Sequence, residues 1–130
     1  MIELVFVIVV LGILAAVAVP RFVATRDDAM IATGRADIAS IRAAIINERQ
    51  SRLFRGDSSF ITNANMDNGG LFGGILTYPI PSVANQDGHW SGAAPTYFYR
   101  VMGVNNTFTY DPANGTFLCT AGAFCSNLTD

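Results

Sequence analysis

The first nineteen residues form an apolar run in which Glu3 is the only charged residue. A helix rises about 1.5 Å per residue, so the run would span about 28 Å, close to the thickness of a membrane's hydrocarbon layer. A cleaved signal peptide has a positive start and a shorter apolar core, and this run has neither. We therefore expect an uncleaved, membrane-competent helix. Pro20 lacks an amide hydrogen, so the helix should kink or loosen near Ala16, and Gly12 is a second point at which the helix is weakened.

Glu3 is the feature that a simple membrane anchor does not explain. An unpaired carboxylate is costly in apolar surroundings, whereas a paired one is much less so. One interpretation places Glu3 at the level of the lipid headgroups, where it does nothing. The other gives it a cationic partner, either the α-amino group of its own chain or that of a neighbouring, staggered chain.

The opening stretch "MIELVFVIVVLGILAAVAVPRF" resembles the N-terminal methylation segment of type IV pilins and of type II secretion pseudopilins. The match rests on Ile2-Glu3-Leu4, Gly12 and Pro20 and covers about 22 of the 130 residues. The resemblance implies cleavage by a prepilin peptidase, N-methylation, storage in the bacterial inner membrane and extraction by a pilus assembly platform. It also implies a homopolymeric helical filament in which Glu3 aligns each incoming subunit on its neighbour's amine.

Residues 22–55 continue the helix with an amphipathic pattern. Isoleucines recur at helical spacing and predict a face that packs on a sheet, while small residues on the remaining surface would let other helices approach closely. Gly56 marks the end of the pattern, so the helix would be about 50 residues long and must protrude from so small a domain. A protruding apolar rod needs lipid or copies of itself. The isoleucines are Ile31, Ile38, Ile41 and Ile45.

Three arginines follow one another at intervals of seven residues beside the isoleucines. They are either a solvated flank of the helix or partners in salt bridges between subunits, with nearby aspartates as the acids. The arginines are Arg35, Arg42 and Arg49, and the candidate acids are Asp27, Asp28 and Asp37.

The second half of the chain changes character twice. Residues 56–95 are rich in Gly, Asn and Pro and predict a long surface loop with one strand in "LFGGILTY". Residues 96–130 predict short strands in "TYFYRVM", "NTFTYD" and "GTFLCT", with "YDPANGTF" as a hairpin connection. Together with residues 1–21 as the membrane or filament-core half of the helix, the chain predicts an α+β fold. In it, a long protruding N-terminal helix packs on an antiparallel sheet of three or four strands, as in the pilin fold.

Cys119 and Cys125 lie close together near the C-terminus, and the only histidine, His89, is thirty residues away. A metal site would want more ligands nearby, which leaves a disulfide or two free thiols. A disulfide favours an oxidising compartment. Many pilins staple a C-terminal loop at a similar place.

The sequence offers little for catalysis, since it has one histidine, two glutamates and no nucleophile elbow, phosphate loop or metal-ligand cluster. We expect neither an enzyme nor a bound cofactor or metal. A net charge of −2 gives no indication of nucleic acid binding. The stretch Asp87-Gly88-His89-Trp90 is either a surface loop with a half-buried tryptophan or a ligand site. Asn-x-Thr triplets, which are potential modification sites, begin at Asn105, Asn114 and Asn127.

These observations favour a structural protein, the repeating subunit of an extracellular type IV pilus that serves motility, adhesion or DNA uptake. The nearest alternative is a type II secretion pseudopilin that forms a periplasmic pseudopilus. A third hypothesis, from a different class, is a monomeric membrane-tethered module that binds a ligand at the loop containing Asp87 and His89.

Overall fold

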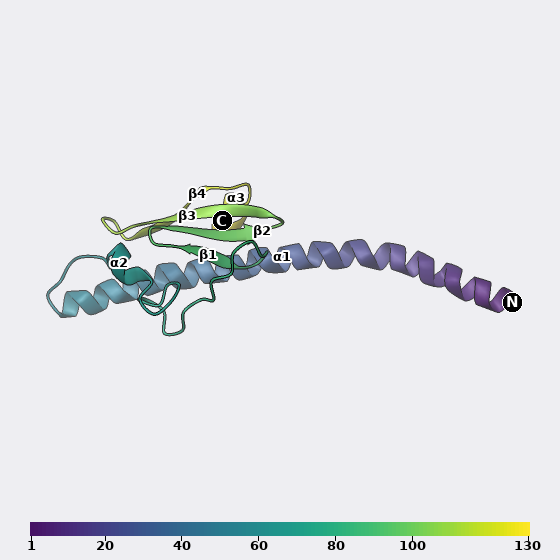
Figure 1. The fold of residues 1–130 in the computed structure, drawn as a ribbon, viewed down its shortest axis with the longest axis horizontal. Helices are drawn as coiled ribbons and strands as arrows, with labels where there is room; N and C mark the ends of the chain where they lie inside the picture. Colours follow the sequence, from purple (N-terminus) through teal and green to yellow (C-terminus); the bar gives the residue numbers. More distant parts are fainter.

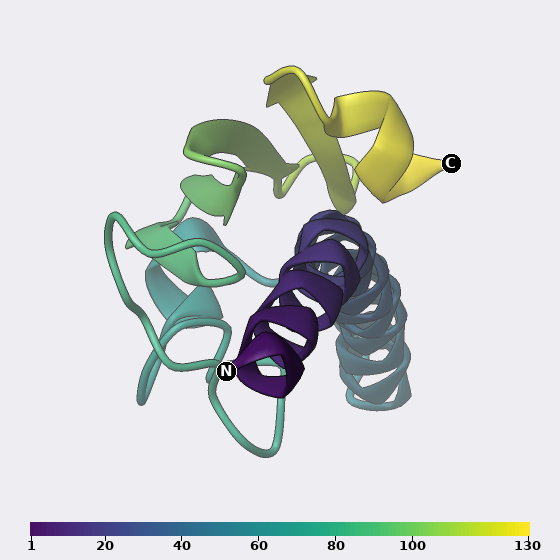
Figure 2. The same ribbon diagram turned by 90° about the vertical axis from the view of Figure 1, so that its right-hand side faces the viewer.

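The computed structural model describes residues 1–130 and consists of one long helix that carries a small antiparallel sheet. The helix runs the length of the molecule, and the sheet covers only its C-terminal half (Figure 1). Viewed along the helix, the sheet and the loop preceding it lie to one side, and the opposite side is uncovered (Figure 2). The α+β layout predicted from the sequence is confirmed, and it matches that of the pilin fold.

Helix α1 spans Ile2–Phe54, 53 residues without a break. Ile38, Ile41 and Ile45 are buried, as their spacing predicts. The helix closes where Gly56 adopts a φ of +86° and its amide donates to the Leu53 carbonyl at 3.0 Å. Positive φ is open to glycine at little cost, so Gly56 ends the helix as expected.

The sheet is a four-stranded meander in the order β1-β2-β3-β4, with every neighbouring pair antiparallel. The outer strands are β1 and β4, and β1 makes a further isolated parallel bridge through Trp90 to Ser82. The strands are β1 Trp90–Ala93, β2 Thr96–Val101, β3 Val104–Asp111 and β4 Thr116–Ala121. The last three correspond to the predicted strands, and the hairpin between β3 and β4 closes through the Gly115 amide, which donates to Asp111 at 2.8 Å.

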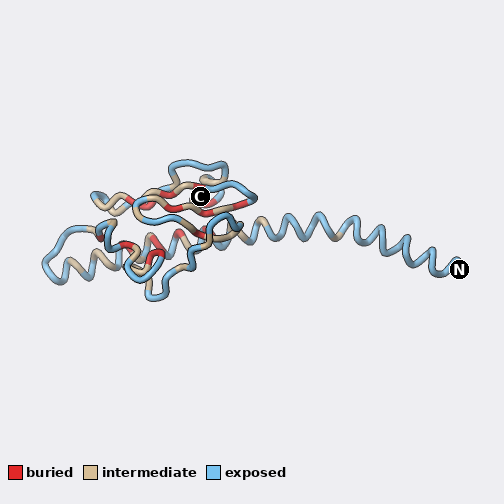
Figure 3. The backbone as a smooth tube through the Cα atoms, in the orientation of Figure 1, coloured by how far each residue is buried: buried red, intermediate tan, exposed pale blue.

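The core lies between the isoleucine face of α1 and the inner face of the sheet, and it is largely aromatic (Figure 3). Alternate residues of β2 and β3 point inward, which is the period-two pattern of a strand with one face buried. Phe108 stacks on Phe117 with ring centroids 5.3 Å apart. The fully buried aromatic side chains are Phe72, Trp90, Tyr97, Tyr99, Tyr110, Phe108 and Phe117.

The strand predicted in "LFGGILTY" is wrong. The segment makes only an isolated bridge between Leu71 and Ile80, and the rest of it is turns. Gly69, Gly70 and Phe72 all adopt positive φ, so the chain bends and inserts the Phe72 ring into the core instead of extending. A short helix that we did not predict, α2 Asn63–Met66, precedes these turns.

The expectation of a surface loop with a half-buried Trp90 is also wrong. Trp90 opens strand β1, is 1% exposed, and pairs in register with Tyr99 of β2. Its indole Nε1 donates to the Asp37 carboxylate at 2.9 Å, which joins the sheet to α1. Local composition predicted a loop because glycines surround the tryptophan, but pairing with β2 makes the segment a strand.

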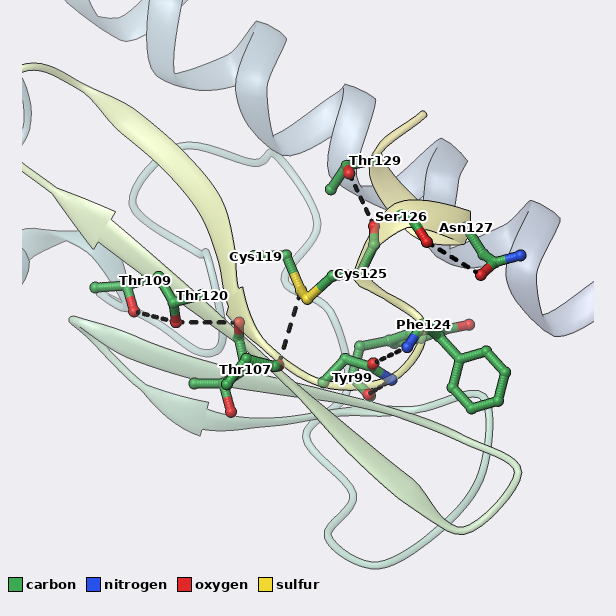
Figure 4. Close-up of a disulfide and its surroundings, with 12 residues drawn as sticks. Tyr99, Thr107, Thr109, Cys119, Thr120, Phe124, Cys125, Ser126, Asn127 and Thr129 are labelled. Atoms are coloured by element: carbon green, nitrogen blue, oxygen red, sulfur yellow. Dashed lines mark hydrogen bonds between the residues drawn. A yellow bond between two sulfur atoms is a disulfide. The ribbon is translucent and has the colours of Figure 1, made fainter.

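The two cysteines form a disulfide, Cys119–Cys125, with Cα atoms 5.6 Å apart. It links β4 to the short terminal helix α3, Cys125–Thr129 (Figure 4). Leu128 of α3 is buried, and α3 packs on α1. The disulfide therefore fastens the end of the chain to β4. Of the two alternatives left open by the sequence, a disulfide or two free thiols, the structure has the disulfide.

Candidate assembly surface

No residue of the N-terminal half of α1 belongs to the hydrophobic core. Of residues 1–28 all are exposed except Ala18 and Asp27, which are half-buried, and Figure 3 shows this half extending beyond the sheet. Counting from the N-terminus, Met30 is the first residue that a hydrogen bond joins to the sheet, because its carbonyl accepts from the Tyr99 hydroxyl at 2.7 Å. We call residues 2–28 the rod.

The rod belongs to the single helix in the structure that is long and apolar enough to cross a membrane, judged by length and composition. None of its most apolar 18-residue window is buried. Large side chains such as Ile2, Leu4 and Phe6 are more than two-thirds exposed. A soluble monomer rarely exposes so much contiguous apolar surface, so the rod is suited to lipid or to other protein.

Glu3 lies in the first turn of α1 with an exposed side chain. It forms no hydrogen bond and no ion pair within the chain. An acidic residue in the first turn is favoured by the helix dipole, but the remainder of the carboxylate's hydrogen-bonding capacity is open. The structure thus leaves Glu3 available to a group outside the chain.

Gly12 and Pro20 both lie within unbroken helix. A Cβ atom added at Gly12 would meet no other atom within 4 Å, so nothing in the folded monomer requires a glycine there. Pro20 sits inside α1, which continues through it with a gentle bend and no break (Figure 1). Beside it lies a hollow that is lined by Leu14, Val17, Ala18, Arg21, Phe22 and Thr25.

The arginines spaced at seven-residue intervals all make contacts within the chain. The Nε of Arg35 donates to the carbonyl of Asn127, and the Nε of Arg42 donates to the carbonyl of Phe117 at 3.1 Å. The guanidinium of Arg49 lies 4.2 Å above the centre of the Phe60 ring. Each arginine thus contacts a different part of its own domain, while Arg35 is exposed and Arg42 and Arg49 are half-buried. Both interpretations of these arginines, a solvated flank or salt bridges between subunits, stay predictions.

The three candidate acids differ in what they contact. Asp37 is bound to Trp90, and partial burial raises its pKa although the indole hydrogen bond opposes that rise. Asp27 and Asp28 form no hydrogen bond or ion pair within the chain. The predicted salt bridges between subunits therefore retain only Asp27 and Asp28 as acids.

The loop considered as a ligand site is held by hydrogen bonds to the rest of its own domain. The Asp87 carboxylate accepts from the Nε of Arg100 at 3.1 Å and from the Gly103 amide at 2.9 Å, so it ties the loop to the β2–β3 hairpin. The His89 ring nitrogen Nδ1 lies 3.1 Å from the Asp87 carbonyl. The structure contains no group of three or more His, Cys, Asp or Glu side chains placed to hold a metal ion.

Sequence reasoning missed the point where the domain grips the helix. A Cβ atom at Gly34 would come within 2.5 Å of the Tyr99 ring and 2.8 Å of the Leu128 side chain. Gly34 therefore lets both side chains approach the helix backbone directly. A glycine inside a helix is unfavourable by about 1 kcal/mol relative to alanine, and that cost was the available signal of a close contact.

Comparison with known proteins gives no match to a family model, a curated protein or a solved structure. The structural observation that bears on function is the rod, which lies outside the core of the domain.

Proposed function

We propose that this chain is the structural subunit of a type IV pilus and polymerises through its N-terminal helix. The rod is held in the inner membrane before assembly and is covered by the rods of other copies in an extracellular filament. The sheet domain lies on the outside, where it faces solvent and serves motility, adhesion or DNA uptake. Prepilin peptidase and the assembly platform are the partners that this role implies.

The observation that carries the proposal is the bareness of residues 2–28. The domain has its own aromatic core and disulfide, and no residue of the rod belongs to that core. The apolar part of the rod is about 28 Å long, and exposing it to water is unfavourable. Lipid covers this part during storage, and sister helices cover it in a filament.

Glu3 supports a filament over a plain anchor. A carboxylate weakens membrane insertion, so an anchor would gain from its loss. A filament subunit uses it, because pairing with the α-amino group of a neighbour is favourable only at one stagger of the two helices. Apolar side chains alone would let two helices pack at several staggers, and the Glu3 pair selects one of them.

A pseudopilin of type II secretion shares the rod and Glu3, and it remains the alternative. A monomeric binding module is favoured less, because Asp87 and His89 both make hydrogen-bond contacts within the chain that hold the loop. The two filament functions differ in where the polymer is found. A pilus is recovered from the medium by shearing cells, whereas a pseudopilus stays in the periplasm.

The test compares Glu3→Val with Glu3→Asp in the native host. Both variants should insert in the inner membrane at the level of the unchanged chain. Surface filaments should be absent or rare with Glu3→Val and present with Glu3→Asp, which keeps the charge. Electron microscopy of sheared material gives the count, and membrane fractionation gives the control. Normal filaments from Glu3→Val would overturn the role of Glu3. An unchanged chain that forms no polymer anywhere in the cell would overturn the function itself.

A further inference from the structure

A groove runs between α1 and the free edge of strand β4. It is lined by Arg42, Ile46, Gly115, Thr116, Phe117 and Leu118. Ile46 is 54% exposed and Leu118 is 53% exposed, so two large apolar side chains stand in solvent on either side of it. Edge strands offer unpaired backbone groups, and most proteins protect them. Here Arg42 covers one such group, the Phe117 carbonyl.

Arg42 gives the groove a charge that has no counterpart within the chain. Its Nε is used by Phe117, but it forms no ion pair, and its terminal nitrogens have no hydrogen-bond acceptor. Arginine carries five donors in a fork that matches a carboxylate. An apolar groove with one free guanidinium suits a partner that presents apolar side chains next to one carboxylate.

We propose that the occupant of this groove is the neck of α1 from a second copy, with Asp28 of that copy paired to Arg42. This inference rests on the proposed function, because it names a contact between subunits of the filament. The neck is defined as residues 14–28, which contain the hollow beside Pro20 and end at Asp28.

Asp28 is selected by excluding the other acids. The carboxylates of Asp37, Glu48, Asp57, Asp67, Asp87 and Asp111 all accept hydrogen bonds within the chain. Asp27 lies eleven residues before Ile38, three helical turns, and so it shares the face that packs on the domain. Glu3 is at the far end of the rod, and Asp130 ends the chain beyond α3. Asp28 is exposed, unpartnered and one turn from the hollow.

The apolar parts of the two surfaces also complement each other. The neck is hollowed beside Pro20 and exposes apolar side chains there, with Val17 57% and Phe22 72% exposed, while Ile46 and Leu118 project from the groove. Arg21 lines the same hollow. It lies seven residues before Asp28, on nearly the same face of the helix but about 10 Å further along its axis, so it is two turns away from the Asp28–Arg42 pair. One contact therefore covers exposed apolar surface on both copies and pairs two charges that lack partners.

The geometry of such a contact agrees with a filament. The neck and the groove are different surfaces of one chain, so each copy presents both. When the neck of one copy pairs with the groove of another, the first copy still has a free groove and the second a free neck. A contact of this head-to-tail kind extends into an open helix unless its rotation happens to close a ring. A dimer formed by identical surfaces would instead stop at two copies.

The test is a charge reversal measured as filament yield. Asp28→Arg should reduce filaments by more than about tenfold, because two like charges would meet in a partly desolvated contact. Asp28 is exposed and forms no ion pair within its own chain, so the melting temperature of the solubilised variant should be unchanged. The double variant Asp28→Arg with Arg42→Asp should restore most of the yield.

The matched control reverses an equally exposed but unrelated acid. Asp130→Arg alone should leave the yield unchanged, and Asp130→Arg combined with Arg42→Asp should fail to restore it. Normal filaments from Asp28→Arg would overturn the proposed pair while leaving the filament function intact. Failure of the double variant, with its domain folded and its disulfide formed, would also overturn it. Absence of filaments from the unchanged chain would instead refute the function on which the pair rests.

Discussion

The two halves of α1 obey different rules, although they form one uninterrupted helix. In the half that bears the sheet, charged side chains point to the domain and are used by it, as with Arg35, Asp37 and Arg42. In the rod, Glu3 is the only charged side chain before Arg21, and it forms no ion pair within the chain. The sheet-bearing half is explained by the fold of a monomer. The rod is explained only by what surrounds the monomer.

The comparison is sharpest for removal of a large aromatic side chain. Phe108 is fully buried against Trp90 and Phe117, so Phe108→Ala should lower the free energy of unfolding by about 3–5 kcal/mol. Phe6→Ala, in the rod, should leave that free energy unchanged. Chemical denaturation of the solubilised protein measures both. Equal destabilisation by the two variants would mean that the rod takes part in the fold of the domain.

Removal of the disulfide tests whether the domain folds without help from the rod. Replacing both Cys119 and Cys125 by alanine should cost about 2–3 kcal/mol, the value for a loop of this small size. Membrane insertion, which depends on the rod, should be unaffected. Melting curves and membrane fractionation of the same preparation report the two properties. Loss of insertion together with loss of stability would contradict the separation of the two regions.

The two helical glycines offer a matched pair. Gly34→Ala places a methyl group against Tyr99 and Leu128, and we expect a loss of about 1–3 kcal/mol from the resulting strain. Gly12→Ala meets no atom and should leave domain stability unchanged. Thermal unfolding followed by near-ultraviolet circular dichroism distinguishes them. A stable Gly34→Ala variant would show that the domain does not grip the helix at this point.

The smallest expected effect concerns pH and Asp37. Burial raises the pKa of this carboxyl in the folded state, so the folded protein binds more protons than the unfolded chain between the two pKa values. The contribution of Asp37 to stability is therefore fully present below its unfolded pKa and declines as pH rises through the folded one. Asp37→Asn, which still accepts the Trp90 hydrogen bond, should gain stability relative to the unchanged chain as pH rises above about 4, the unfolded pKa of an aspartate. A difference that shrinks as the pH rises above that value would contradict the assignment.

The long helix and the three C-terminal strands could be predicted because their signals are local. Isoleucines at helical spacing and alternating aromatics each identify a buried face without knowledge of the rest of the fold. Trp90 and Phe72 could not be placed in this way. Both lie in glycine-rich segments that read as loops, and both are buried because β2 and the helix supply the surfaces on which they pack.

The candidate site was predicted in part for the same reason. Glu3, Gly12 and Pro20 are recognisable from the sequence of the rod alone, because all three are exposed and the rod lies outside the core. The fates of Arg35, Arg42 and Arg49 depend on partners about 75 to 92 residues away for the first two and on Phe60 for the third. Only the folded structure reveals that Arg42 lines a groove and forms no ion pair within the chain.

The central claim is that residues 2–28 are covered by other copies of the same chain. Electron microscopy of filaments sheared from the native host, averaged to side-chain resolution, tests it directly. The account predicts a core made of these residues, enclosed by neighbouring helices, with the β-sheets outside. If the protein is instead found only as separate molecules in the bilayer, the account is contradicted.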